Sequence, residues 1–177
     1  MTAPPRLALG VAAGAPALLM DLLKAMGLQG APLVGKDAHG RPTLCVEGER
    51  LALSRSRASG HCAVAVALTG RIGVDLVALE GNDLSLLEAH FHPSEKIWLK
   101  AKGEPDRNLA LAQCWAAKEA VLKALGLGLG LGLDAVELIP DEHSQLRILR
   151  IAGQGAEGWN LALSRAENLV VALAWAP

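Results

Sequence analysis

The stretch LALSR at residues 51–55 occurs twice in this chain and decides the expected fold. The same five letters return at residues 161–165, and each copy leads into an apolar run, at residues 62–68 and 169–175. Each pair of segments has the length and order of a β-hairpin, and a segment with helical spacing lies upstream of each. We therefore expect two similar halves, each a helix with an antiparallel sheet; chance similarity in an Ala/Leu-rich chain is the alternative.

The other elements are expected to complete an α/β (α+β) fold. One helix is predicted at residues 16–26, a second at 84–91, a third starting at Pro93, and the longest at 107–125. Residues 27–42 read as loop, and the Gly-Leu alternation at 126–133 reads as a loop or a hairpin arm. We expect one compact unit over residues 1–177, with pseudo-halves at approximately 1–80 and 81–177.

Composition excludes several classes of function. The chain has 177 residues, of which 51% are hydrophobic and 20% charged, so it is long and apolar enough to bury a core. Its 17 Lys and Arg against 18 Asp and Glu give a net charge of −1. Without a basic field and with few aromatic side chains, nucleic acid is not an expected partner. No apolar run reaches the length of a membrane span, so no membrane partner is expected either.

The three cysteines, Cys45, Cys62 and Cys114, form no C-x-x-C pair and have no zinc-site spacing. This pattern is typical of small buried thiols in a reducing compartment, and it predicts a cytoplasmic location. Gly30 to Asp37 approaches a phosphate-binding loop, but an acid stands where that motif needs a hydroxyl group. His90 and His92 lie two residues apart, a spacing that turns the two rings to opposite sides of a helix and does not favour a metal site.

Two segments hold charged residues in suggestive positions. Asp75 interrupts the apolar run at residues 72–79, either as an outward-facing acid or as a buried carboxylate that needs a cation or hydrogen-bond donors. Gly73, two residues earlier, allows another group to approach the backbone closely. Glu119 and Lys123 are four residues apart on the longest predicted helix, where a surface ion pair would explain them equally well.

Together the two segments resemble the signature of the 4'-phosphopantetheinyl transferase superfamily, in particular its two-halved, surfactin-synthetase-activating type with a shortened N-terminal half. The signature is roughly G-[IV]-D followed by [FW]-[STAC]-x-K-E-[AS]-x-x-K, and it matches at 73–75 and 115–123. Three weaker features fall in the family's order. Gly40-Arg41-Pro42 resembles G-[KR]-P, Ser59-Gly60 resembles the end of S-H-S-G, and the segment from Phe91 to Glu95 resembles F-[FS]-x-x-E.

The resemblance implies a fold, a reaction and a set of site residues. The fold is the pseudo-twofold 4'-phosphopantetheinyl transferase fold. The reaction moves phosphopantetheine from coenzyme A to a serine of an acyl or peptidyl carrier protein, with Mg²⁺ as the cofactor and a monomer as the expected state. The implied metal ligands are Asp75 and Glu119, the implied catalytic residues are Glu95 as the base with Lys118 and Glu119, and the implied coenzyme A contacts are Arg41, Ser59, Lys118 and Lys123.

Two positions depart from the family pattern. Val77 stands where larger members carry a further acid, and Ala58 stands where S-H-S-G has its histidine. An active transferase is the main hypothesis, because a protein that only binds has little reason to keep a metal site. The alternative is a non-catalytic relative that binds coenzyme A or a carrier protein.

Overall fold

The computed structural model describes residues 7–80, 84–104, 106–126 and 128–177. The strands are β1 (Leu7–Ala12), β2 (Leu33–Lys36), β3 (Pro42–Val46), β4 (Glu49–Ala58), β5 (His61–Ala67), β6 (Arg71–Ala78), β7 (Val136–Pro140), β8 (Leu146–Ile151), β9 (Gln154–Gly155), β10 (Asn160–Ala166) and β11 (Leu169–Ala176). The α-helices are α1 (Ala15–Ala25), α2 (Pro93–Lys100) and α3 (Asp106–Leu125). Three 3₁₀ segments are η1 (Leu84–His90), η2 (Gly128–Leu131) and η3 (Leu133–Ala135).

The strand order repeats between the two halves, as the LALSR echo predicted. The first sheet runs β1-β5-β4-β3-β2 and the second runs β10-β11-β6, both antiparallel. In each half an opening strand is followed by a helix and pairs with the last strand of a hairpin, and the two LALSR copies lie in β4 and β10. The fold is therefore a mixed α+β fold with the two similar helix-plus-sheet halves expected from the sequence.

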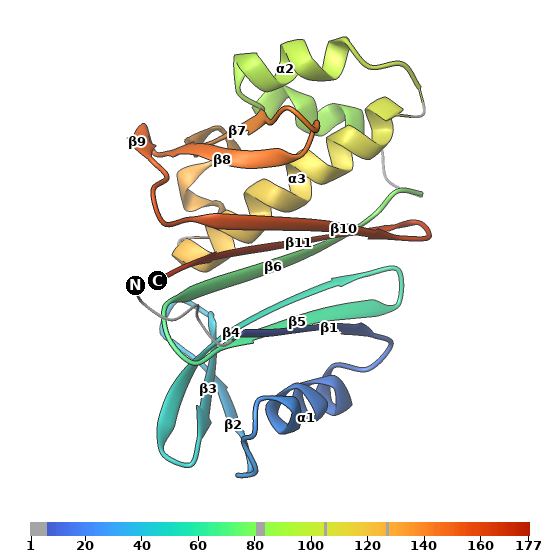
Figure 1. Ribbon diagram of the computed structural model, residues 1–177. Coiled ribbons are helices and arrows are strands. Elements are labelled where there is room, and N and C mark those ends of the chain that lie inside the picture. The colour runs from blue at the N-terminus through green and yellow to red at the C-terminus, as the bar shows by residue number, and fades with distance from the viewer. Residues whose placement is uncertain (1–6, 81–83, 105, 127) are drawn as a thin grey trace.

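The two sheets pack face to face between α1 and α3 (Figure 1). In β5, Val64 and Val66 face α1, whereas Ala63, Ala65 and Ala67 face the second sheet. Because successive side chains of a strand point to opposite faces, a strand covered on both sides reads as a continuous apolar run. The small alanines let the sheets approach closely, and this contact joins the halves.

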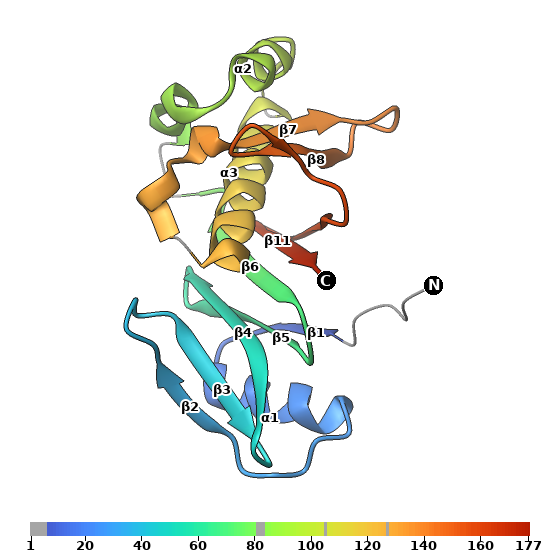
Figure 2. The ribbon, with the colours of Figure 1, turned by 90° about the vertical axis from the view of Figure 1, so that its left-hand side faces the viewer.

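A further layer covers the other side of α3. The third sheet, of order β7-β8-β9, and α2 lie over this helix (Figures 1 and 2). Phe91, Leu99, Val136 and Leu138 pack there into the same core as the buried face of α3. As a result α3 has apolar neighbours on opposite sides, which explains its run of alanines and its broad buried surface.

Some expectations for individual elements were wrong. Residues 27–42 contain strand β2, and residues 84–90 form a 3₁₀ rather than an α-helix. The described part of the Gly-Leu run forms η2 and η3 rather than a hairpin arm. Strand β6 forms its ladder with β11 and not with β5, so residues 68–70 connect the first sheet to the second.

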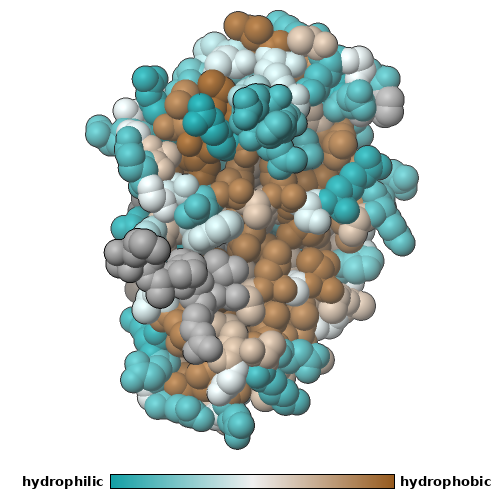
Figure 3. Space-filling view, viewed as in Figure 1, coloured by the Kyte–Doolittle hydropathy of each residue, from teal (hydrophilic) through white to brown (hydrophobic). Residues whose placement is uncertain are grey.

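Apolar surface gathers over the middle of the face seen in Figure 1, with polar groups above and below it (Figure 3). The outer strand β1 carries two exposed apolar side chains, Leu9 and Val11.

Within the described part of the chain, no helix combines the length and hydrophobicity that crossing a membrane requires.

Candidate active site

The close contact of α3 with β6 creates the candidate site. A Cβ atom built on Gly73 would overlap the carbonyl oxygen of Ala120 and lie 2.6 Å from the Ala124 nitrogen. Only glycine allows the helix backbone to come this near to the strand. Residues 119 and 123 are one turn apart and flank this contact, so both face the strand position of Asp75.

Asp75 is buried, with 5% of its surface exposed. The Lys123 ammonium lies 2.6 Å from Asp75 Oδ1 and also donates to the Val74 carbonyl oxygen at 3.2 Å. A second donor comes from β4, where the Ser56 hydroxyl donates to the same Oδ1 at 2.7 Å. The sequence left two alternatives for Asp75, an outward-facing acid or a buried carboxylate. The structure shows the buried carboxylate, paired with a cation.

Glu119 completes a group of two acids and one base. Its Oε1 is buried and has no hydrogen-bond partner among the described residues. Burial raises the pKa of Glu119, the nearby charge of Asp75 raises it further, and Lys123 partly opposes both effects. The structure therefore brings Asp75, Glu119 and Lys123 together.

The donor chemistry of this group fits a hard divalent cation. Mg²⁺ prefers carboxylate oxygens and usually keeps several waters, so one or two protein carboxylates suffice. A buried carboxylate oxygen without a donor, next to a second carboxylate, is a position that a cation would stabilise. The described residues hold no group of three or more His, Cys, Asp and Glu side chains suited to a metal, in agreement with Val77 at the family's further acidic position.

A basic cavity of about 590 Å³ opens beside Lys123 at the meeting of the two halves. Its cationic side chains are Arg41, Arg50, Arg55, Arg71 and Lys123. The Arg41 guanidinium lies against Gly126 at the end of α3, where a side chain in place of glycine would collide with it. Two halves thus contribute positive charge to one cavity, an arrangement that suits an anionic ligand.

Ser59 lies just beyond the end of β4. It occupies the β4–β5 turn and lines a smaller cavity with Arg57 and His61. A third cavity lies between the two, because it shares Arg55 with the basic cavity and Arg57 with the smaller one. Arg41 and Lys123 therefore line the basic cavity, and Ser59 lies at the far end of an adjoining groove.

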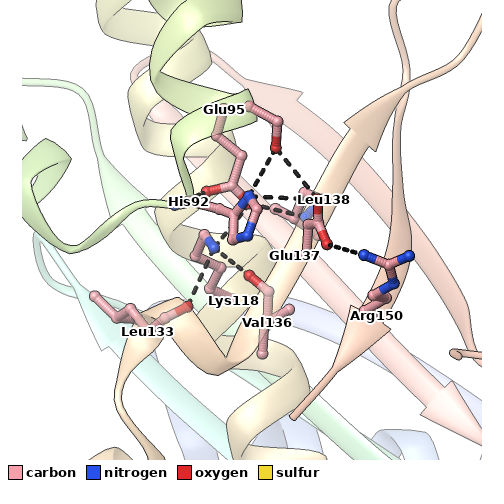
Figure 4. Close-up of polar contacts among 9 residues, drawn as sticks. His92, Glu95, Lys118, Leu133, Val136, Glu137, Leu138 and Arg150 are labelled. Atoms are coloured by element: carbon pink, nitrogen blue, oxygen red, sulfur yellow. Dashed lines mark hydrogen bonds and ion pairs between the residues drawn. The ribbon is translucent and has the colours of Figure 1, made fainter. Parts of the chain in front are cut away.

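Glu95 and Lys118 form a separate, buried ion pair (Figure 4). Lys118 Nζ lies 2.8 Å from Glu95 Oε1 and donates to the carbonyl oxygens of Leu133 and Val136. The side chain of Lys118 is fully buried, and burial lowers its pKa against the opposing effect of Glu95. All three ammonium protons thus have acceptors within the protein.

The carboxylate of Glu95 is equally engaged. Its Oε1 accepts the Leu138 N–H at 2.8 Å, and its Oε2 accepts the His92 N–H at 2.8 Å in the first turn of α2. Neither Glu95 nor Lys118 lines the basic cavity. The structure does not bring these two residues to Asp75 and Glu119; they join α2, α3 and β7 instead.

The imidazole of His92 contacts Ser94 and Glu137 at the surface beside this pair (Figure 4). These two contacts account for the orientation of the His92 ring.

The family model described as the 4'-phosphopantetheinyl transferase superfamily matches residues 71–174, which contain Asp75, Glu119 and Lys123. The chain belongs to this superfamily. The match begins at the first residue of β6, so it covers the second sheet, α3 and the third sheet.

Two curated proteins are similar in sequence. The 4'-phosphopantetheinyl transferase gsp of Aneurinibacillus migulanus is 31% identical over 55 residues, covering 31% of this chain and 23% of the relative. The fatty acid synthase alpha subunit hexA of Dothistroma septosporum is 30% identical over 159 residues, covering 78% of this chain and 48% of the relative. The chain spans less than half the length of each of these relatives.

Solved members of the superfamily share the fold. The Chronobacterium ammoniagenes ACPS–CoA complex superposes with a TM-score of 0.53 and 24% identity, over 62% of this chain and 97% of that one. The holo-(acyl-carrier-protein) synthase of Bacillus anthracis in complex with CoA (3',5'-ADP) gives a TM-score of 0.51 and 21% identity, over 60% and 94%.

Sequence reasoning missed two residues of the site. Arg71 opens β6 and lines the basic cavity, but it matches no position of the family signature. Ser56 was missed because a serine in a strand has no distinctive pattern. A signal was present in the alternation Ser54-x-Ser56, which places two hydroxyl groups on one face of β4.

Proposed function

We propose that this protein transfers 4'-phosphopantetheine from coenzyme A to a serine of an acyl or peptidyl carrier protein, with Mg²⁺ as the cofactor. The serine oxygen forms a new bond to phosphorus of the coenzyme A pyrophosphate. The bond from that phosphorus to the bridging oxygen breaks, and adenosine 3',5'-bisphosphate leaves. The serine gives up its proton, and the products are the holo-carrier protein, the bisphosphate and the released proton.

One observation carries this proposal. Asp75, Glu119 and Lys123, the signature residues that lie on two different elements, meet beside a cavity lined by four arginines. The arginines provide contacts for the phosphates of coenzyme A, since guanidinium groups bind phosphate oxygens well. The solved relatives whose titles name CoA are consistent with this ligand.

The proposal gives each group of residues a task. Asp75 and Glu119 would hold Mg²⁺, which would neutralise negative charge on the pyrophosphate. Lys123 contributes a cation at the same place, and Arg41 contributes one from the other half. In this proposal these residues bind and orient the phosphates, whereas Ser59, which lines the smaller cavity, contacts a more distant part of the ligand.

We propose a structural task for Glu95 and Lys118. Every polar atom of the pair is engaged within the protein, so the pair fixes α2 and β7 against α3. A base must reach the hydroxyl group from which it removes a proton, and only 2% of the surface of Glu95 is exposed. The carrier-protein partner, the monomeric state and the cytoplasmic location stay predictions from the sequence.

The proposal is tested by mass spectrometry of an apo carrier protein incubated with coenzyme A, MgCl₂ and this protein. We expect the carrier to gain the mass of one phosphopantetheine group. Asp75→Ala and Glu119→Ala should each lower the initial rate by at least about 100-fold, because each removes a metal-holding carboxylate.

Matched controls are Asp21→Ala, an exposed acid on α1, and Glu142→Ala, an exposed acid after β7. Both should transfer at the wild-type rate. A wild-type protein that modifies none of several carrier proteins yet binds coenzyme A would contradict transfer and establish the non-catalytic relative.

A further inference from the structure

Two serines of β4 hold β6 at the candidate metal site. Ser54 Oγ accepts the Val74 N–H at 2.9 Å, and the Ser56 hydroxyl donates to Asp75 Oδ1 at 2.7 Å. The serines are two residues apart and so point to the same side of the strand. Ser54 is buried and Ser56 half-buried, so both contacts are shielded from water.

These contacts distinguish the two oxygens of Asp75. Oδ1 receives both the Ser56 hydroxyl and the Lys123 ammonium, whereas no described residue donates a hydrogen bond to Oδ2. Glu119 Oε1, on the neighbouring helix, also has no donor within the described chain. One oxygen of each carboxylate is therefore left with its lone pairs unused.

We propose that Ser56 is a positioning residue for the metal site. Its hydroxyl holds Oδ1 of Asp75, so that Oδ2 stays available, together with Glu119, for a hard divalent cation. Hydrogen bonds to a ligating carboxylate orient it and tune its affinity for the ion. The inference rests on the proposed function in one respect, because it takes the cation to be the Mg²⁺ ion that the transfer uses.

The position of Ser56 in the fold gives this contact a second consequence. Both carboxylates lie within residues 71–174, the part that the family model matches, whereas Ser56 lies in the first half. Ser54 strengthens the contact between β4 and β6 as well, because its Oγ accepts the Val74 N–H. The metal site is therefore complete only when the first sheet packs against the second.

The experiment is isothermal titration of MgCl₂ into the protein, with and without coenzyme A. Ser56→Ala should bind Mg²⁺ about 10–100-fold more weakly than the wild type. Ser56→Thr keeps the hydroxyl group and suits a strand, so it should stay within about threefold of the wild type. Ser164→Ala removes an exposed serine on β10, at the position of the second LALSR copy that matches Ser54, and should bind as the wild type does.

Carrier-protein transfer is measured on the same samples. In Ser56→Ala, the Mg²⁺ concentration at half-maximal rate should rise by the factor that calorimetry gives, whereas the rate at saturating Mg²⁺ should change less than about threefold. This split separates positioning of the ion from general damage to the fold, and circular dichroism confirms that each variant is folded.

Equal Mg²⁺ affinity of Ser56→Ala and the wild type would overturn the inference, as would a Ser56→Thr variant as weak as Ser56→Ala. A wild-type protein that binds Mg²⁺ in a Ser56-dependent way but modifies no carrier protein would overturn the transfer function and leave the inference standing. A wild-type protein that binds no Mg²⁺ with coenzyme A present would overturn both.

Discussion

At the scale of single residues, Glu119 is an acid that the fold holds in an unfavourable place. Its buried Oε1 lacks a donor, and both burial and Asp75 raise the pKa of its carboxyl group. A buried, unpartnered polar atom costs about 1–3 kcal/mol, so this residue lowers stability in the absence of a cation. Under the proposed function, binding of the metal ion accounts for an acid at this position, because folding alone does not favour it.

Glu119→Gln should therefore stabilise the metal-free protein at neutral pH. The native carboxyl group keeps its proton to a higher pH than the unfolded one, so wild-type stability falls as pH rises from the ordinary carboxyl range through the raised pKa. Glutamine has no such dependence. In EDTA at pH 7 we expect a gain of about 1 kcal/mol, or about 2–4 °C in Tm, which disappears at acidic pH.

Thermal unfolding across pH checks this expectation, with the exposed Glu142→Gln as the control. In MgCl₂ with coenzyme A the order should reverse, because only the wild type is stabilised by the ion. A Glu119→Gln variant that is less stable than the wild type in EDTA at neutral pH would refute the argument.

At the scale of elements, the ion pair of Glu95 and Lys118 determines how three segments sit together. The ammonium donates to the carbonyl oxygens of Leu133 in η3 and of Val136 at the start of β7, while the carboxylate caps the first turn of α2. Because each partner is almost fully buried, loss of either leaves an uncompensated charge in the core.

Lys118→Met should destabilise the protein by about 3–5 kcal/mol, measured by urea unfolding. The exposed Lys100→Met on α2 should change stability by less than about 0.5 kcal/mol. If Lys118→Met does not fold, Glu95→Gln is the milder variant to measure, because it keeps an acceptor oxygen.

The transfer rate of Glu95→Gln, counted per folded molecule, should depend on pH as the wild-type rate does. In our proposal the pair acts on structure and does not take the proton of the serine. A profile that loses its acidic limb in this variant would show that Glu95 is the base after all.

At the scale of the whole molecule, the basic cavity exists because the two halves meet. Arg41 lies in the turn before β3, and Arg50 and Arg55 lie on β4, whereas Arg71 opens β6 and Lys123 lies on α3. The near-neutral net charge of the chain conceals this local concentration of cations. Charge gathered at one cavity attracts an anion without making the whole surface basic.

Arg71→Ala should weaken the binding of coenzyme A about tenfold, the loss typical of one charged hydrogen bond. Binding by this variant should also depend less steeply on salt, since one screened attraction is removed. Calorimetry with coenzyme A at low and high ionic strength measures both effects. Arg147→Ala, an exposed arginine on β8, is the matched control. Wild-type affinity in Arg71→Ala would show that the ligand phosphates lie elsewhere.

The sequence by itself determined the layout of the fold and the centre of the site. The repeated LALSR segment predicted two equivalent hairpins, because strand patterns are local. The spacing of Glu119 and Lys123 predicted that both share one face of α3, and Gly73 predicted a close approach to β6. These inferences depend on periodicities within one element, which the order of residues specifies directly.

Only the tertiary structure decided which charged residues face the cavity and which are buried. Lys118 and Glu119 are adjacent in the chain, yet the ammonium group enters the core beside Glu95 while the carboxylate lies beside Asp75. The sequence showed only that Ser54 and Ser56 share one face of β4. The contact of Ser56 with Asp75 and the place of Arg71 at the cavity depend on how one half meets the other. Contacts between distant segments arise from packing, and packing is a property of the whole chain rather than of any local pattern.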